Sequence, residues 1–121
     1  MHYRIPFLPP SLNQIYHPTV GKDGKLKIYK SEEAKRFKKD ASFFLPKHLV
    51  KGKVAVYIRF FIAEKPEKKD LDNLLKLTLD AIEGRLIEND NQVWELTCHK
   101  YEVEEKKEEG VEIEVIPLNP S

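Results

Sequence analysis

The residues best suited to phosphate chemistry stand close together in the middle of the chain. Asp70 and Asp72 lie one residue apart, directly after Lys68 and Lys69, and Asp90 follows further along. Two neighbouring carboxylates repel each other unless positive charge lies between them. Their hard oxygen ligands suit Mg²⁺, with Mn²⁺ as a substitute. The pattern therefore indicates a divalent-metal site, with Asp90 as a third ligand if the chain brings it near.

The same residues also have a purely structural interpretation. Asp70 stands where a helix would begin, so it is a candidate helix cap, and Asp72 would then complement the helix dipole. Lys76 follows Asp72 by one helical turn. It would either form a surface ion pair with Asp72 or act as a cation that stabilises charge on an attacked phosphate. The helix is predicted to end at Gly84 and to bury a stripe at three- and four-residue spacing, made of Leu71, Leu74, Leu75, Thr78, Leu79 and Ile82.

The composition is that of one soluble domain. The chain has 121 residues, of which 40% are hydrophobic and 34% charged, enough for a single modest core. We find no apolar run long enough to span a membrane and no signal-peptide pattern at the start, so a cytoplasmic protein is expected. Cys98 is the single cysteine, which excludes an internal disulfide.

Charge is distributed unevenly along the chain. Residues 1–60 carry 13 Lys and Arg against 4 Asp and Glu, whereas residues 61–121 carry 8 against 16. The folded protein is therefore either dipolar, with a basic face that attracts phosphates, or built from halves that interleave and cancel.

Periodicity predicts both strands and helices. One helix should begin after Ser31 and end near Pro46, and the second is the helix that Asp70 opens. A glycine-rich turn at 21–25 suggests a short hairpin after a polar loop at 11–19. Alternating apolar residues predict strands at 1–8, 53–63, 92–103 and 111–117.

This order of elements predicts the fold class. We expect an α+β fold, a single domain over residues 1–121, with two main helices packed on a mixed β-sheet. The strands at 92–103 and 111–117 are expected to pair as an antiparallel hairpin. Phe43, Phe44 and Trp94 are expected in the core or in a dimer interface, and Cys98 is expected to be a buried small hydrophobe.

Two blocks of the sequence together resemble the RusA family of Holliday junction resolvases. One reads DLDNLLKLTLDAIEG and then IENDNQV, and the other reads LPPSLNQIYHP near the N-terminus. They are similar to the family patterns D-x-D-N-x-x-K-x-x-x-D-A, D-x-Q-V and P-P-S-x-N-x-x-Y. One departure is that Asn89 stands where the family often has an acid before the ligand position.

The resemblance implies a metal-dependent endodeoxyribonuclease that acts in DNA recombination and repair. Such an enzyme binds four-way DNA junctions as a homodimer and cuts two opposed strands. The family's three essential aspartates fall on Asp70, Asp72 and Asp90, its catalytic lysine on Lys76, and a basic residue before the site on Lys69.

Several further residues are candidates for contact with branched DNA. Lys68 and Lys69 adjoin the acidic site, Asn13 and Tyr16 stand in the predicted N-terminal loop, and Lys100 lies on a predicted strand. Lysines would neutralise phosphates without reading sequence. Three alternatives remain open: a less selective nuclease for branches or flaps, a branched-DNA-binding module without cleavage, and a small interaction protein.

Overall fold

The fold is organised around β4 (Val54–Ile62), in a computed structural model that describes residues 1–10, 16–20, 26–30 and 32–118. Successive side chains of a strand point to opposite faces of a sheet. Val56, Ile58 and Phe60 are fully buried on one face of β4, while Tyr57 and Arg59 on the other face are half-buried. The apolar alternation that predicted this strand therefore also defines which face carries the core.

β4 lies inside a four-stranded mixed sheet with the order β1-β6-β4-β5. On one side it pairs antiparallel with β6 (Gly110–Pro117), which in turn pairs antiparallel with β1 (His2–Ile5). On the other side it pairs parallel with β5 (Val93–Glu102), the edge strand of the described sheet. The predicted mixed sheet is confirmed.

The predicted hairpin between the last two strands is wrong, because β4 lies between them. After β5 the chain does not turn back tightly. The amide of Val103 donates to the carbonyl of Ile62 at 3.0 Å, and the 3₁₀ turn η3 (Lys106–Glu108) carries the chain past the end of β4. β4 is so apolar that pairing with a strand on each side stabilises it. The charged segment between β5 and β6 can cross the end of β4 in contact with solvent.

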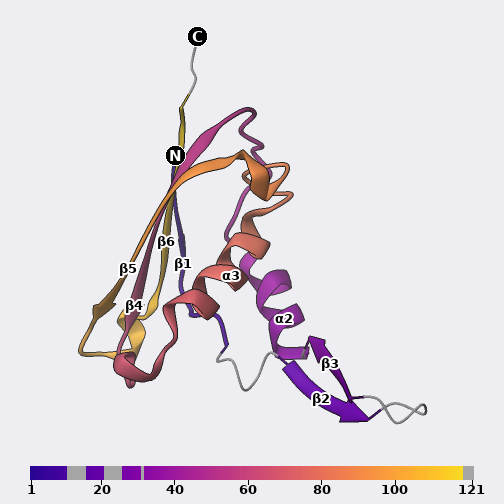
Figure 1. The fold of residues 1–121 in the computed structure, drawn as a ribbon. Coiled ribbons are helices and arrows are strands. Elements are labelled where there is room, and N and C mark those ends of the chain that lie inside the picture. The colour runs from indigo at the N-terminus through magenta and orange to yellow at the C-terminus, as the bar shows by residue number, and fades with distance from the viewer. Residues whose placement is uncertain (11–15, 21–25, 31, 119–121) are drawn as a thin grey trace.

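Both α-helices of the described chain lie on one face of the sheet (Figure 1). Helix α3 (Leu71–Ile82) links β4 to β5, as a parallel pair requires a crossover connection. Helix α2 (Glu32–Ala41) packs beside α3. The result is the expected α+β fold. Within the described ranges, no helix has the length and apolar character needed to cross a membrane.

The stripe that helix α3 buries overlaps the predicted one at Leu74, Thr78 and Ile82 and is shifted around the helix from it. Its buried residues are Leu74, Leu77, Thr78, Ala81 and Ile82. Leu71, Leu75 and Leu79 are only partly buried. Because α2 packs against one side of α3, the core-facing surface extends around to Leu77 and Ala81, and the opposite side of the stripe is left open. Gly84 follows the C-cap residue Glu83 with φ +85°, a conformation that favours glycine, and its amide donates to the carbonyl of Ile87 at 2.7 Å.

The N-terminal elements are partly as expected. The predicted hairpin is confirmed: β2 (Tyr16–Val20) pairs antiparallel with β3 (Leu26–Lys30) in a separate two-stranded sheet. The prediction of a loop through residue 19 is wrong, because the backbone from Tyr16 onward pairs with β3. Helix α2 ends at Ala41, earlier than predicted, and turns complete the segment before Pro46. Ser31 lies outside the described residues.

Two of the aromatic residues expected in the core or in a dimer interface are exposed in the single chain. Phe43 is 76% exposed and Trp94 is 64% exposed, so neither belongs to the core of this chain. Phe44 is 46% exposed and packs edge-on against Phe7, with ring centroids 5.6 Å apart. Cys98 is half-buried rather than buried.

Candidate active site

The segment between β4 and α3 is held by contacts from β5 and from the residue that precedes β6. Glu109, the residue between η3 and β6, accepts hydrogen bonds from the amides of Ala63 at 2.9 Å and Glu64 at 3.3 Å. Further along, Lys100 of β5 donates from its ammonium group to the carbonyls of Pro66 and Lys69, both at 2.9 Å. These bonds fix both ends of the approach to α3.

The loop has its own local structure as well. Lys65 adopts a left-handed conformation with φ 50°, and a 3₁₀ turn, η1 (Pro66–Lys68), follows it. Proline at the first position of such a turn has no amide to leave unpaired. The local structure of the loop thus fixes the direction in which α3 begins.

Asp70 and Asp72 mark the start of α3. Asp70 is the helix cap, and its Oδ1 accepts from the amide of Asp72 at 3.1 Å. Both side chains are exposed, so their remaining oxygens face solvent. The structural role that the sequence suggested for Asp70 is therefore confirmed. It does not exclude ligation, because a carboxylate has about four acceptor sites and the cap uses one of them.

The effect of Asp72 on the pKa of Cys98 also indicates where Asp72 lies. Burial raises the pKa of the Cys98 thiol, and the negative charge of Asp72 raises it further. Cys98 pairs in register with the buried Ile58, so it lies on the helix-covered face of β5. Asp72 therefore lies beside β5, and exposed Lys76 follows one turn later on α3.

Asp90 stands in a turn that side-chain amides hold in place. It is the first residue of η2 (Asp90–Gln92), and it is exposed. Asn89 accepts from the amide of Asn91 at 2.9 Å, while Gln92 accepts from the amides of Glu88 and Asn89 at 2.7 and 3.0 Å. An amide at position 89 caps this turn as an acid would, which accounts for the departure from the family pattern.

The same turn is tied to the segment that enters β4. The Nε2 of Gln92 donates to the carbonyls of Val50 and Gly52, at 2.8 and 2.9 Å. Sequence reasoning treated Gln92 only as part of a motif. The signal for its anchoring role is that an amide side chain, which can both donate and accept hydrogen bonds, stands two residues after Asp90.

Asp90 and the aspartate pair lie at opposite ends of the sheet within one chain. Asp90 begins the η2 turn that leads into β5, whereas Lys100, near the other end of β5, contacts the residue before Asp70. Seven residue steps of strand separate Val93 from Lys100, or about 23 Å. No three His, Cys, Asp or Glu side chains of the described ranges form a group that could hold a metal ion. One chain therefore presents Asp70 and Asp72 together, and Asp90 apart from them.

The other candidate residues fall in different places. Lys68 is exposed beside the pair, and Lys69 is half-buried. Lys100 faces the η1 loop, with its ammonium group engaged by two carbonyls, so its described contacts hold the loop. Tyr16 begins β2, although its side chain is not described, and Asn13 lies outside the described residues.

The charge asymmetry is partly cancelled and partly kept in the fold. Arg4 of β1 lies 3.5 Å from Glu112 of β6, so the basic and acidic halves interleave there. Helix α2, in contrast, retains a row of exposed cations at Lys35, Arg36, Lys38 and Lys39. The basic and acidic halves therefore interleave at β1 and β6, whereas α2 keeps a basic surface.

Comparison with known proteins adds the family. The family model described as endodeoxyribonuclease RusA matches residues 6–116, which cover nearly the whole chain. A search of individually characterised proteins gives no match. The matched range includes the anchored loop, the acidic start of α3 and the η2 turn, so the chain belongs to the RusA family of endodeoxyribonucleases.

Proposed function

We propose that this protein is a Mg²⁺-dependent endodeoxyribonuclease that resolves four-way DNA junctions during recombination and repair, by paired hydrolysis of opposed strands. The observation that supports this most directly is the exposed pair of Asp70 and Asp72 on an anchored helix start, in a chain of the RusA family. A binding module without cleavage would gain nothing from clustered acids that repel DNA.

The aspartate pair fits a hard divalent cation by its chemistry. Both residues offer carboxylate oxygens to solvent, as Mg²⁺ or Mn²⁺ requires. When bound, such a cation would offset the repulsion between the carboxylates and lower the pKa of a water molecule that attacks the phosphodiester. Lys76 then stands where its charge stabilises negative charge developing on the phosphate. Lys68 and Lys69 meet the neighbouring phosphates.

We infer that Asp90 is supplied by a second copy of the chain. A two-fold axis beside α3 would bring the start of α3 in one chain next to the η2 turn of the other. Two equivalent sites would result, each with Asp70 and Asp72 from one protomer and Asp90 from its partner. Two symmetric sites also match a substrate whose two opposed strands are both cut.

The surface beside α3 and β5 supports this arrangement. Leu75 and Leu79 are left partly open on α3, and Leu96 on the neighbouring edge strand is 42% exposed. Leu96 pairs in register with the buried Val56, so it lies on the same side of the sheet as α3. We call these three leucines the α3–β5 strip. A second copy would bury the strip and pair the otherwise open edge of β5.

The experiment that tests the function is cleavage of a synthetic four-way junction and of a matched linear duplex, with Mg²⁺ and with EDTA. We expect paired nicks in the junction alone, lost with EDTA and in Asp72→Asn. Equal cutting of flaps and three-way branches would instead establish a less selective nuclease. Tight junction binding without cutting in either Mg²⁺ or Mn²⁺ would overturn the proposed activity in favour of a binding module.

A further inference from the structure

The face of the sheet opposite the helices is covered by no described element (Figure 1). Register defines the side chains that it presents. One cross-strand row holds His99, Arg59, Glu112 and Arg4, and the next row toward η1 holds Tyr101 and Phe61. This open face thus combines aromatic rings with guanidinium groups, on the opposite side of the sheet from the start of α3.

The aromatic rings of the open face form a contiguous cluster, in which Phe61 and Tyr101 are stacked and His99 is tilted by 34° against Tyr101. Phe61 and Tyr101 lie with ring centroids 5.4 Å apart and planes 19° apart, and His99 lies 5.9 Å from Tyr101. Tyr101 remains 42% exposed. Cross-strand aromatic pairs stabilise sheets, and that role accounts for Phe61. It does not require that Tyr101, the central ring of the three, stay exposed.

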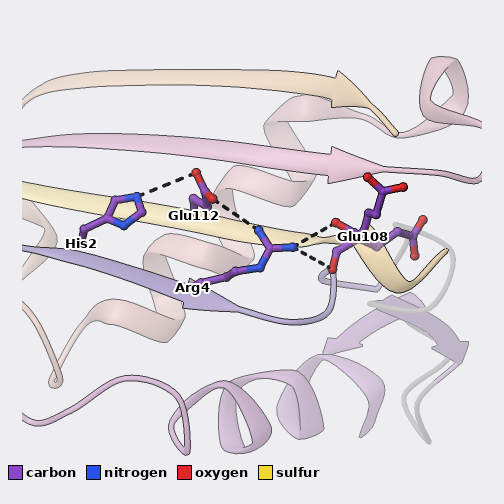
Figure 2. Close-up of polar contacts among 5 residues, drawn as sticks. His2, Arg4, Glu108 and Glu112 are labelled. Atoms are coloured by element: carbon purple, nitrogen blue, oxygen red, sulfur yellow. Dashed lines mark hydrogen bonds and ion pairs between the residues drawn. The ribbon is translucent and has the colours of Figure 1, made fainter. Parts of the chain in front are cut away.

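The two arginines of this face differ in their contacts. Arg4 has its guanidinium over the ring of Phe61, at 5.4 Å from its centroid, and it also binds Glu112 and the carbonyl of Glu108 (Figure 2). These contacts hold β1 to β6 and to the η3 turn. The guanidinium of Arg59 has no ion pair or hydrogen bond with any residue of the described ranges. Its charge is therefore available to an anion.

A pocket of about 200 Å³ opens beside Arg59, between β4 and β5. Its lining includes one guanidinium, two phenol rings, an imidazole and a hydroxyl. The residues that line it are Tyr57, Ile58, Arg59, Thr97, His99 and Tyr101. The nearest acid in the same row, Glu112, has its oxygens 3.5 Å from Arg4 and 3.8 Å from His2. Among the residues that line the pocket, Arg59 carries the charge, whereas Glu114 and Glu95 lie on the same face beside Tyr57 and Ala55.

We propose that this pocket binds an unpaired nucleotide of single-stranded DNA, with the base stacked on Tyr101 and His99 and a phosphate paired with Arg59. Exposed rings with adjacent cations are the usual elements of such sites, because every base has a face that can stack. The proposal rests on the proposed function only in taking DNA as the nucleic acid. It adds a second contact surface, for strands that are unpaired near a branch.

The test measures binding of a fluorescent oligothymidylate of about 12 nucleotides and of the matched duplex to the full chain in EDTA. We expect Tyr101→Leu and Arg59→Gln each to weaken single-strand binding about tenfold, and to leave duplex binding unchanged. Arg59→Gln should also reduce the salt dependence of single-strand binding, whereas Tyr101→Leu should not. Phe43→Leu and Lys107→Gln are the matched controls, because they remove an exposed ring and an exposed cation elsewhere.

Photocrosslinking of an iododeoxyuridine oligonucleotide to the wild-type protein gives a second measurement that does not depend on the folding of variants. Crosslinks at Tyr101 or His99 support the site. Crosslinks confined to α2, or single-strand binding by both variants at the wild-type level, would overturn it. Junction cleavage by the same variants separates the two proposals: cutting with no single-strand site removes only this inference, and a single-strand site with no cutting removes only the proposed activity.

Discussion

The ammonium group of Lys100 lies 2.9 Å from the carbonyl oxygen of Lys69, the residue directly before Asp70. Its second bond, to Pro66, spans the η1 turn. A lysine on β5 therefore connects the sheet to the start of α3, and it holds the backbone that presents both aspartates. Its sequence-based assignment as a DNA contact stays a prediction, but its described contacts point to positioning.

Replacing Lys100 should therefore impair cleavage more than binding. Lys100→Met keeps the aliphatic chain and removes the donors. We expect the unfolding free energy to fall by about 1–3 kcal/mol and junction cleavage to fall about 10- to 100-fold, because the aspartates are displaced. Junction affinity in EDTA should stay unchanged.

Lys107→Met, in the η3 turn, is the control for loss of one positive charge. Urea unfolding, single-turnover cleavage and salt titration of binding measure the three effects. Weaker binding with a reduced salt dependence and normal cleavage would show that Lys100 contacts DNA instead.

The local elements of this fold were predictable because their signals are local. The alternation through β4 and the cap at Asp70 each depend on residues close in sequence. The order of strands is not local, and the charged connection 103–109 does not specify which strand β6 joins. The buried side of α3 was also misjudged, because α2 packs on that helix from a distant part of the chain.

The candidate site also has local features that the sequence predicts and non-local features that it does not. The residues that carry charge at the start of α3 were identified from the sequence, but their distance from Asp90 was not. That distance depends on α3 and β5 running along the sheet, because the strand from Val93, at the end of the η2 turn, to Lys100 is about 23 Å long. The anchoring roles of Gln92 and Glu109 were also missed, because hydrogen bonds from distant side chains to backbone leave little trace in sequence.

The thiol of Cys98 should report the charge of Asp72. Its pKa is raised by burial and then by Asp72, so less of it is thiolate at a given pH than for an ordinary cysteine. Alkylation by iodoacetamide should therefore increase at a higher pH than in the urea-unfolded chain. Asp72→Asn removes one of the two causes, so the increase should move to lower pH.

Asp40→Asn, on α2, is the control for removing a carboxylate that does not act on Cys98. Mass spectrometry of the alkylated protein across a pH series gives both profiles. Identical profiles for wild type and Asp72→Asn would contradict the placement of Asp72 beside β5.

Disrupting the α3–β5 strip should prevent dimer formation. Leu96→Lys places a charge where the proposed interface buries an apolar side chain, so the dimer dissociation constant should rise at least about tenfold. Ile116→Lys is the matched control, because Ile116 is 37% exposed but lies on the open face of β6. Sedimentation measures the assembly, and junction cleavage should fall in parallel for Leu96→Lys alone. A dimer of unchanged stability in Leu96→Lys would place the interface elsewhere.

Complementation between inactive variants tests whether each active site uses two chains. Asp72→Asn and Asp90→Asn should each reduce cleavage at least about 100-fold as homodimers, because each lacks a ligand in both sites. In a mixed dimer the two substitutions meet in one site and leave the other site intact. Co-expressed chains should therefore recover nicking, with about a quarter of the wild-type number of sites when the chains mix at random.

The matched control is co-expression of Asp70→Asn with Asp72→Asn. Both residues lie at the start of the same α3, so every mixed dimer carries one substitution in each site and no activity should return. Nicking by the first pair and not by the second would establish that Asp90 acts across the interface. If neither pair recovers, while sedimentation shows that mixed dimers form, the three aspartates must act within one chain, and the η2 turn would have to move toward α3 on binding DNA.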